Sequence, residues 1–141
     1  MDTMVGAARQ LARTAHEGQV DKLGAPYFGH VERVAANFSA EPVVQTVAYL
    51  HDVVEDTSYT LCELEYPQEV LDAVEAITRQ VDETYKEFID RVSRNEIATR
   101  VKIADLKDNL DPERMARAFS DETTRRSMTR RYLRALETLS G

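Results

Sequence analysis

Residues 42–56 read PVVQTVAYLHDVVED, and their apolar residues recur at the spacing of a helix. Pro42 suits the first helical position, so we expect a helix from Pro42 to about Val54. With successive residues about 100° apart, one arc of this helix is wholly apolar and must face a core. Its members are Val43, Val47, Leu50, Val53 and Val54. The stretch therefore predicts an amphipathic helix against a helical core.

The other half of the same helix carries His51, Asp52, Glu55 and Asp56. His51 and Glu55 are one turn apart, as are Asp52 and Asp56. Three carboxylates crowded beside an imidazole repel one another unless a cation or water neutralises them. A solvated acidic helix end is the alternative, but the helix dipole disfavours carboxylates near a C-terminus. We therefore interpret this cluster as a functional site.

Helical periodicity recurs along the rest of the chain, and alternating strand patterns are nearly absent. The first predicted helix ends near Gly18, a polar connection covers Gln19–Gly29, and the next helix starts near His30. Thr60 and Glu63 fit a capping box for a short helix. Later helices are expected after Pro67, after a cap at Asp82, over Glu96–Leu110, around Met115 and Phe119, and over the C-terminal stretch. The prediction is an all-α, compact single domain over residues 1–141, with roughly seven or eight helices.

The composition is that of a soluble globular domain, with 43% hydrophobic and 30% charged residues among 141. The sequence contains no apolar run near the ~20 residues that span a bilayer. The first residues, MDTMVGAARQ, lack the order of a secretory signal. A single cysteine, Cys62, favours a reducing compartment. We expect a cytoplasmic location.

A formal net charge of -7 argues against nucleic acid or a membrane as partner, since both attract basic surfaces. A small anionic substrate remains compatible, because a bound metal ion can override the overall sign. The C-terminal stretch is rich in arginine, interleaved with acidic residues. The arginines are Arg125, Arg126, Arg130, Arg131 and Arg134. We interpret them as a solvated face or the edge of a homodimer.

Two further segments place metal-ligating residue types on inward faces. Asp105 continues the apolar stripe of Ile97, Ala98 and Val101, and a carboxylate there is costly unless it is paired or binds a metal. Asn109 follows one turn later. A structural Asp105, capping a neighbouring helix or pairing with arginine, is the alternative.

His30 lies one turn before inward-facing Val34, and His16 extends the face of Ala8 and Ala12. Each histidine alone is compatible with a satisfied core residue. Together, two imidazoles and two carboxylates make a mixed nitrogen and oxygen ligand set suited to Mn, Fe, Co, Ni or Zn.

Three motifs in order resemble the hydrolase domain of RelA/SpoT-type enzymes and their small stand-alone relatives, which belong to the HD superfamily. They are AHEGQVDKLGAPYFGH (15–30), AYLHDVVEDT (48–57) and VKIADLKDN (101–109), within a similarity that spans Ala8–Asn109. The resemblance implies an HD-type helical fold. It also implies a phosphohydrolase that removes the 3′-diphosphate of guanosine tetra- and pentaphosphate.

By position, the resemblance implies that one metal ion is bound by His30, His51, Asp52 and Asp105. In this family the ion is usually Mn²⁺. Glu55 and Asp56 match the acidic pair that positions or activates the attacking water. For both residues, support of His51 through its other ring nitrogen is the alternative. The substrate-binding candidates are Lys22, Asn109 and His16, the last as a pocket or supporting group.

The sequence departs from the family at two points. Lys22 is the only basic residue in GQVDKLG, and Val31 follows the first ligand histidine where proline is common. Another HD-type nucleotide phosphatase or phosphodiesterase, or a non-catalytic metal- or nucleotide-binding regulator, remains open as an alternative. For Lys102 and Lys107, phosphate binding is conceivable, but a solvated helix face is favoured. Tyr27 is expected to pack beside His30.

Overall fold

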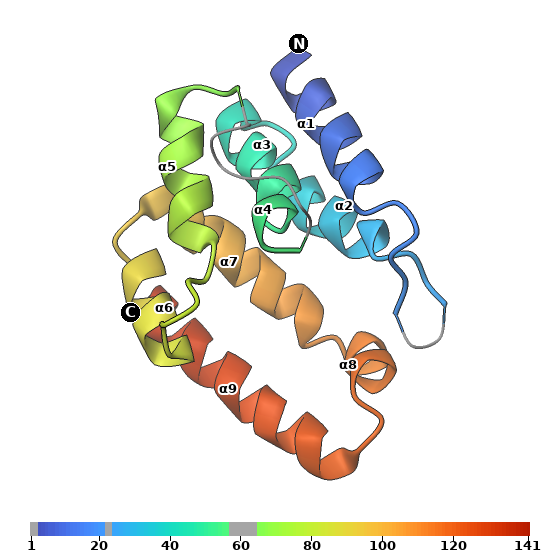
Figure 1. The fold of residues 1–141 in the computed structure, drawn as a ribbon. Helices are drawn as coiled ribbons and strands as arrows, with labels where there is room; N and C mark the ends of the chain where they lie inside the picture. The colour runs from blue at the N-terminus through green and yellow to red at the C-terminus, as the bar shows by residue number, and fades with distance from the viewer. Residues whose placement is uncertain (1–2, 22–23, 57–64) are drawn as a thin grey trace.

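The computed structural model describes residues 3–21, 24–56 and 65–141. Within these residues the regular secondary structure is helical, apart from an isolated bridge between Val20 and Pro26 (Figure 1). The helices are α1 (Thr3–Ala15), α2 (Phe28–Ala36), α3 (Pro42–Leu50), α4 (Val53–Asp56), α5 (Gln68–Ile77), α6 (Tyr85–Val92), α7 (Glu96–Asn109), α8 (Pro112–Ala118) and α9 (Glu122–Ser140). The all-α prediction is confirmed, and the helix expected from Pro42 to about Val54 is present in the described residues as two pieces, α3 and α4.

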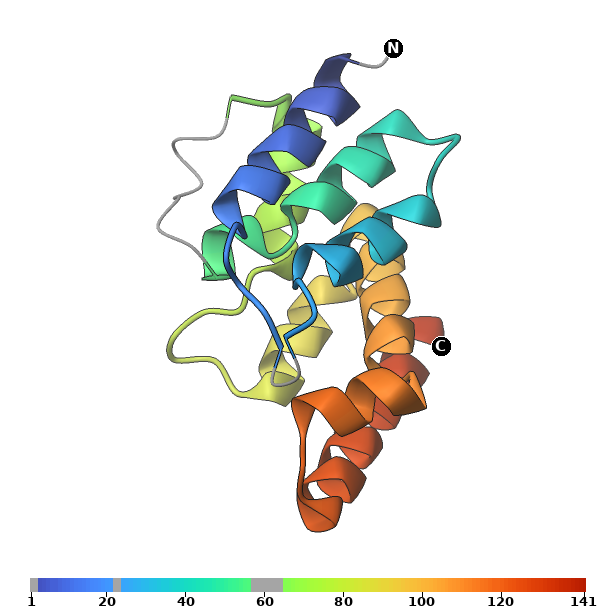
Figure 2. The ribbon, with the colours of Figure 1, turned by 90° about the vertical axis from the view of Figure 1, so that its right-hand side faces the viewer.

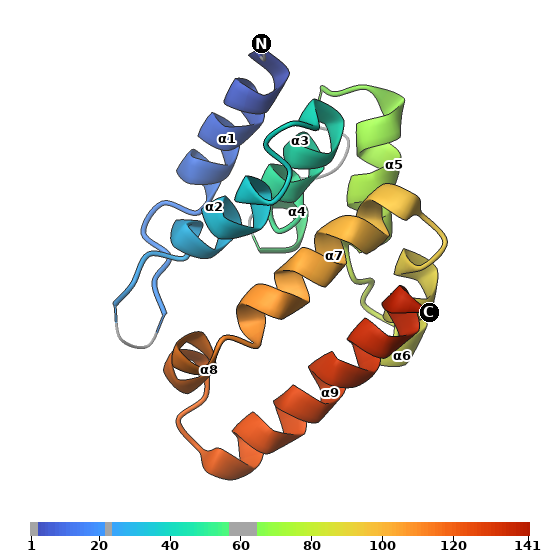
Figure 3. The ribbon, with the colours of Figure 1, turned by 180° about the vertical axis from the view of Figure 1, so that it is seen from behind.

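Helix α7 lies at the centre of the arrangement. It packs against α2, α3 and α5 on one side and against α6, α8 and α9 on the other. Seen from behind, α7 runs between the α1–α2–α3 group and the long α9 (Figure 3). Helix α8 and the start of α9 lie at the end of the molecule opposite the N-terminus (Figure 2). Polar residues on α7 can therefore meet residues of α2, of the α3–α4 segment and of α8.

The core consists of the apolar stripes predicted from the sequence. Fully buried residues include Val34 of α2, Val47 and Leu50 of α3, Val74 of α5 and Val101 of α7. Each such side chain contributes roughly 1.5–3 kcal/mol by leaving water. None of the helices in the described part of the chain is long and apolar enough to cross a membrane.

Side-chain caps fix the starts of several helices. Thr84 caps α6 in a capping box with Glu87, so the predicted cap at Asp82 is wrong by two residues. The reason is that Glu87, at the third helical position, can reach back to the backbone N–H of Thr84. Asn95 caps α7 by accepting from the Ala98 N–H at 2.9 Å. The predicted capping box at Thr60 and Glu63 lies outside the described residues.

The connection before α2 turns at Gly18 (φ 84°) and Gly24 (φ 90°), a backbone region that glycine adopts most easily. Tyr27 then donates its N–H to the Gln19 carbonyl at 2.9 Å. This contact brings the end of α1 and the start of α2 together, and it places the Tyr27 and His30 rings next to each other.

Candidate metal centre

The helix predicted over Pro42 to Val54 is interrupted at His51 and Asp52. Helix α3 ends at Leu50, the two residues form a turn, and α4 begins at Val53. The His51 Nδ1–H donates to the Ala48 carbonyl at 2.6 Å. In an unbroken helix that carbonyl would accept from the Asp52 N–H, so the imidazole competes with the helical bond. The prediction of one continuous helix was therefore wrong, and the turn points both His51 and Asp52 toward α7.

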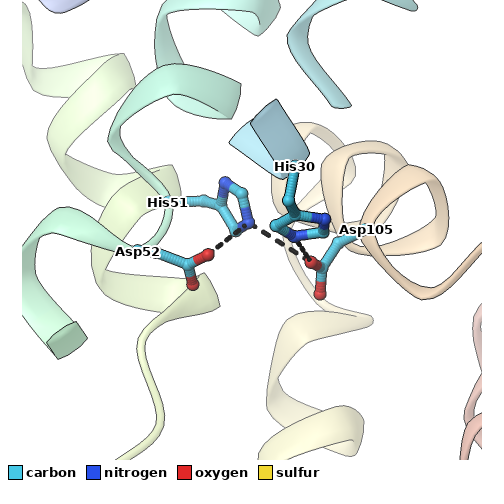
Figure 4. A group of neighbouring side chains, drawn as sticks. All are labelled: His30, His51, Asp52 and Asp105. Atoms are coloured by element: carbon cyan, nitrogen blue, oxygen red, sulfur yellow. Dashed lines mark hydrogen bonds and ion pairs between the residues drawn. The ribbon is translucent and has the colours of Figure 1, made fainter. Parts of the chain in front are cut away.

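Figure 4 shows His30, His51, Asp52 and Asp105 pointing toward one another from α2, the α3–α4 turn and α7. His30 Nε2 lies 2.7 Å from Asp105 Oδ1, and His51 Nε2 lies 3.4 Å from the same oxygen. His51 Nε2 lies 3.0 Å from Asp52 Oδ2. One ligand-type atom from each side chain falls within 4.8 Å of the others. The four residues selected from the sequence therefore meet in space.

Both imidazoles present the same ring nitrogen to this cluster. His30 Nδ1 lies 2.6 Å from Asp108 Oδ2, and His51 Nδ1 lies 2.6 Å from the Ala48 carbonyl. Because each acceptor requires a proton on Nδ1, the lone pair of each neutral imidazole is on Nε2, facing Asp105. Histidines that bind metals are commonly fixed in this way. The donor set therefore fits a divalent cation.

The electrostatics of the cluster also fit a cation. Burial alone would lower the pKa of His51, but the nearby Asp52 and Asp105 carboxylates raise it well above the usual range. Burial opposes ionisation of Asp52, yet the neighbouring His51 lowers its pKa to about 2. The buried carboxylates are thus held ionised and attract a positive charge between them, which protons or a metal ion can supply.

Lys102 does not lie on a solvated face, so that prediction was wrong. Its Nζ lies 2.9 Å from Asp105 Oδ2 with 14% of the side chain exposed, and 5.3 Å from the centre of the Phe88 ring. Helix α7 packs against α6, and this packing covers a position that α7 viewed alone would leave in water. Lys102 occupies one oxygen of Asp105 and leaves the other facing the histidines. Lys107 is exposed, as expected.

Two residues that were not among the predicted site residues support the cluster. Asp108 accepts from His30 and is ion-paired with Arg33. The Tyr27 hydroxyl donates to Asp52 Oδ2, and the Tyr27 ring lies 5.4 Å from that of His30. The expected packing of Tyr27 beside His30 is confirmed, but its bond to Asp52 was not foreseen. Asp108 could have been identified from the sequence, because it lies three residues after Asp105 and therefore on the same side of the helix.

The predicted catalytic carboxylates lie on α4. Glu55 is exposed, and its Oε2 accepts from the Arg79 N–H at 3.3 Å. Although the side chain as a whole is exposed, its carboxyl group is partly shielded from water, and this desolvation and the charge of Asp52 raise the pKa of Glu55. The hydrogen bond from the Arg79 N–H acts in the opposite direction. Asp56 is the last residue of α4, and its side chain lies outside the described part of the structure. Glu55 is thus a carboxylate near the cluster whose affinity for protons is increased.

The predicted substrate residues have different surroundings. Lys22 lies outside the described residues. Asn109 is half-buried at the end of α7, and its Oδ1 accepts from Arg114 Nε at 3.0 Å. His16 is 2% exposed and its Nδ1 contacts Gln19 Oε1 at 2.9 Å. Among the described residues, no hydrogen-bond partner reaches the buried Nε2 of His16.

Known proteins share this architecture. No protein-family model matches the chain. A solved metazoan structure, described as an orthologue of SpoT that hydrolyses ppGpp and has a role in starvation responses, superposes with a TM-score of 0.83. The match has 25% sequence identity and covers 100% of this chain and 88% of the other. The chain is an HD-type relative of the SpoT hydrolases.

The bacterial relatives are longer than this chain. A Haemophilus influenzae guanosine-3′,5′-bis(diphosphate) 3′-pyrophosphohydrolase is 32% identical over a 116-residue alignment that covers 71% of this chain. The "Probable GTP pyrophosphokinase" of Mycobacterium leprae is 30% identical over a 135-residue alignment that covers 82% of this chain. The chain spans 17% of the length of each. The similarity is therefore to one part of these larger proteins.

Proposed function

We propose that this protein is a metal-dependent phosphohydrolase that removes the 3′-diphosphate from guanosine 3′-diphosphate 5′-di- or triphosphate. The observation that carries the proposal is the convergence of two Nε2 atoms and two carboxylates within 4.8 Å. The hydrogen bonds at both Nδ1 atoms support it, because they orient the lone pairs toward the same point. The similarity to 3′-pyrophosphohydrolases supports the choice of substrate.

In this proposal His30, His51, Asp52 and Asp105 hold one divalent ion. The proposed ion is Mn²⁺, which is usual in the family that the sequence resembles. A bound divalent ion polarises a phosphoryl oxygen and lowers the pKa of a coordinated water. Lys102 keeps Asp105 in place through its 2.9 Å contact with Oδ2. The Tyr27 hydroxyl does the same for Asp52.

Glu55 is the proposed general base. Its raised pKa suits a group that takes a proton from water near neutral pH. As the water oxygen bonds to phosphorus, the bond between phosphorus and the 3′ oxygen breaks. Pyrophosphate leaves, and the 3′ oxygen takes up a proton to become a hydroxyl. Asp56 is proposed to assist Glu55, while Lys22, Asn109 and His16 are proposed to contact the nucleotide.

The test is a turnover assay on chelator-treated protein resupplied with Mn²⁺. A panel of nucleotides with and without a 3′-diphosphate is offered, and released phosphate is distinguished from released pyrophosphate. We expect pyrophosphate from the 3′-diphosphate nucleotides only. Asp52→Ala should abolish turnover, and Glu55→Gln should reduce it about 100-fold or more, as expected on removal of a general base.

Asp90→Ala is the matched control, because Asp90 makes an exposed 3.4 Å ion pair with Lys86 on α6. Its turnover should equal that of the wild type. Turnover that survives Asp52→Ala would place the activity elsewhere. Mn²⁺ binding without turnover of any nucleotide would point to a non-catalytic regulator.

A further inference from the structure

Arg114, on α8, touches several residues that surround the candidate metal centre. Its Nε donates to Asn109 Oδ1 at 3.0 Å, and it lies 3.3 Å from Asp108 Oδ2. Its guanidinium carbon lies 5.7 Å from the centre of the Tyr27 ring. Only 19% of the side chain is exposed. One guanidinium therefore joins the end of α7 to the segment before α2.

Local structure places Arg114 at this point. Pro112 is at the start of α8, and Asp111 caps the helix by accepting from the Arg114 N–H at 3.1 Å. The cap fixes the backbone of Arg114 within the first turn. The side chain can then reach back to Asn109, which is five residues earlier.

Two of the groups that Arg114 contacts act directly on the proposed metal ligands. Asp108 bonds to His30 Nδ1, and Tyr27 donates to Asp52. Asp108 has a second cationic partner, because Arg33 donates to it at 2.8 and 3.2 Å. Asp108 would therefore remain ion-paired without Arg114. For Asn109, by contrast, Arg114 is the partner that orients the amide.

The bond to Arg114 determines which way round the Asn109 amide lies. A guanidinium has donors and no acceptor, so the atom of Asn109 that faces it must be the oxygen. The amide NH₂ is then the end left for a ligand, and it can only donate. Asn109 is consequently suited to an acceptor oxygen, such as one on a phosphate or a sugar.

We propose that Arg114 is a positioning residue for substrate, which holds the Asn109 amide so that its NH₂ faces the nucleotide. This rests on the proposed function. Arg114 acts on substrate affinity through Asn109, while Arg33 maintains the Asp108–His30 contact.

A double-mutant cycle tests this role on the Mn²⁺-loaded protein with a 3′-diphosphate guanosine nucleotide. Arg114→Gln is expected to raise KM about tenfold with kcat changed less than about threefold. Asn109→Ala should raise KM similarly, and Arg114→Gln should add less than twofold in the Asn109→Ala background. A KM of Arg114→Gln within twofold of wild type would overturn the proposal. So would a double variant whose increase in KM equals the product of the increases in the two single variants.

Three additional measurements separate positioning from general damage. Arg126→Gln is the matched control, since Arg126 is 72% exposed and pairs with Glu122 on α9; its KM should be unchanged. The Kd for Mn²⁺, measured by calorimetry, should change less than threefold in Arg114→Gln, and a larger loss would contradict the role of Arg33. If Arg114→Gln fails to fold, Arg114→Met takes its place with the same expected rise in KM, because a thioether donates no hydrogen bond to the Asn109 oxygen.

A readout independent of activity distinguishes this inference from the proposed function. Failure of the wild type to turn over any nucleotide would refute the proposed function. The orientation of Asn109 would still be tested by its side-chain NH₂ signals in a ¹H–¹⁵N spectrum, assigned by their loss in Asn109→Ala. These signals should shift in Arg114→Gln and stay in place in Arg126→Gln. Unchanged signals in Arg114→Gln would refute the positioning role.

Discussion

Removing the Asp108 carboxylate should weaken metal binding although Asp108 is not a proposed ligand. Its Oδ2 lies 2.6 Å from His30 Nδ1, and the His30 side chain is 1% exposed. Burial raises and the bond to His30 lowers the pKa of Asp108, with a net value of about 2, so the group is a carboxylate at neutral pH. This carboxylate keeps the His30 proton on Nδ1 and the lone pair on Nε2.

In Asp108→Ala the buried Nδ1 loses its acceptor. The imidazole proton is then favoured on Nε2, where Asp105 Oδ1 is 2.7 Å away and can accept it. A metal ion must displace that proton before it binds. Loss of such a supporting carboxylate typically weakens metal affinity 10- to 100-fold, or about 1.4–2.7 kcal/mol. We expect the upper end for Asp108→Ala and about tenfold for Asp108→Asn, whose amide oxygen can still accept from Nδ1.

The assay is calorimetric titration of Mn²⁺ into chelator-treated protein at fixed pH, with a thermal unfolding curve for each variant. Asp90→Ala, which removes an exposed ion pair with Lys86 on α6, serves as the control and should bind as the wild type does. A folded Asp108→Ala that binds Mn²⁺ within twofold of the wild type would contradict this expectation, because it would show that the tautomer of His30 does not limit binding.

Two further predictions concern other contacts. Tyr27→Phe removes the hydroxyl that donates to Asp52, and turnover at saturating Mn²⁺ should fall about tenfold with little change in the melting temperature; unchanged turnover would refute a supporting role. Arg91 bonds to Glu83 at 2.7 Å and lowers the Glu83 pKa from 4.5 to about 2, against the opposing effect of burial. Because the folded-state pKa is depressed, the stabilisation is present above pH 4.5 and is lost as the pH falls toward 2. In urea unfolding, the free energy of unfolding of the wild type should therefore exceed that of Glu83→Gln by about 1 kcal/mol at pH 7 and by much less at pH 3. A difference that does not change with pH would contradict this prediction.

The helical architecture followed from local patterns. Apolar residues at helical spacing predicted the faces that became the core, as at Val47 and Val101. Helix ends were less well predicted. Asp82 and Thr84 are both suitable caps, and the choice between them depended on the reach of the Glu87 side chain.

The break at His51 could not be read from periodicity. A 3.6-residue repeat continues through His51 and Asp52, and only the side-chain bond to the Ala48 carbonyl ends α3. The supporting residues were missed for a related reason. Asp108 and Arg114 look like ordinary charged residues on their own helices, and their partners are distant in sequence or on another element.

The residue types available for chemistry, and the helix faces that carry them, could be predicted without any knowledge of the packing. Two histidines and an aspartate continue apolar helix faces, and burying such side chains without partners costs free energy in any fold. Their positions therefore indicated a metal-binding site. Tertiary packing decided the rest: which ring nitrogens face the cluster, that Lys102 is buried against Asp105, and which way the Asn109 amide points. The physical reason is that helical periodicity specifies the direction of a side chain about its own axis. The atom it meets depends on how α2, α7 and α8 pack together.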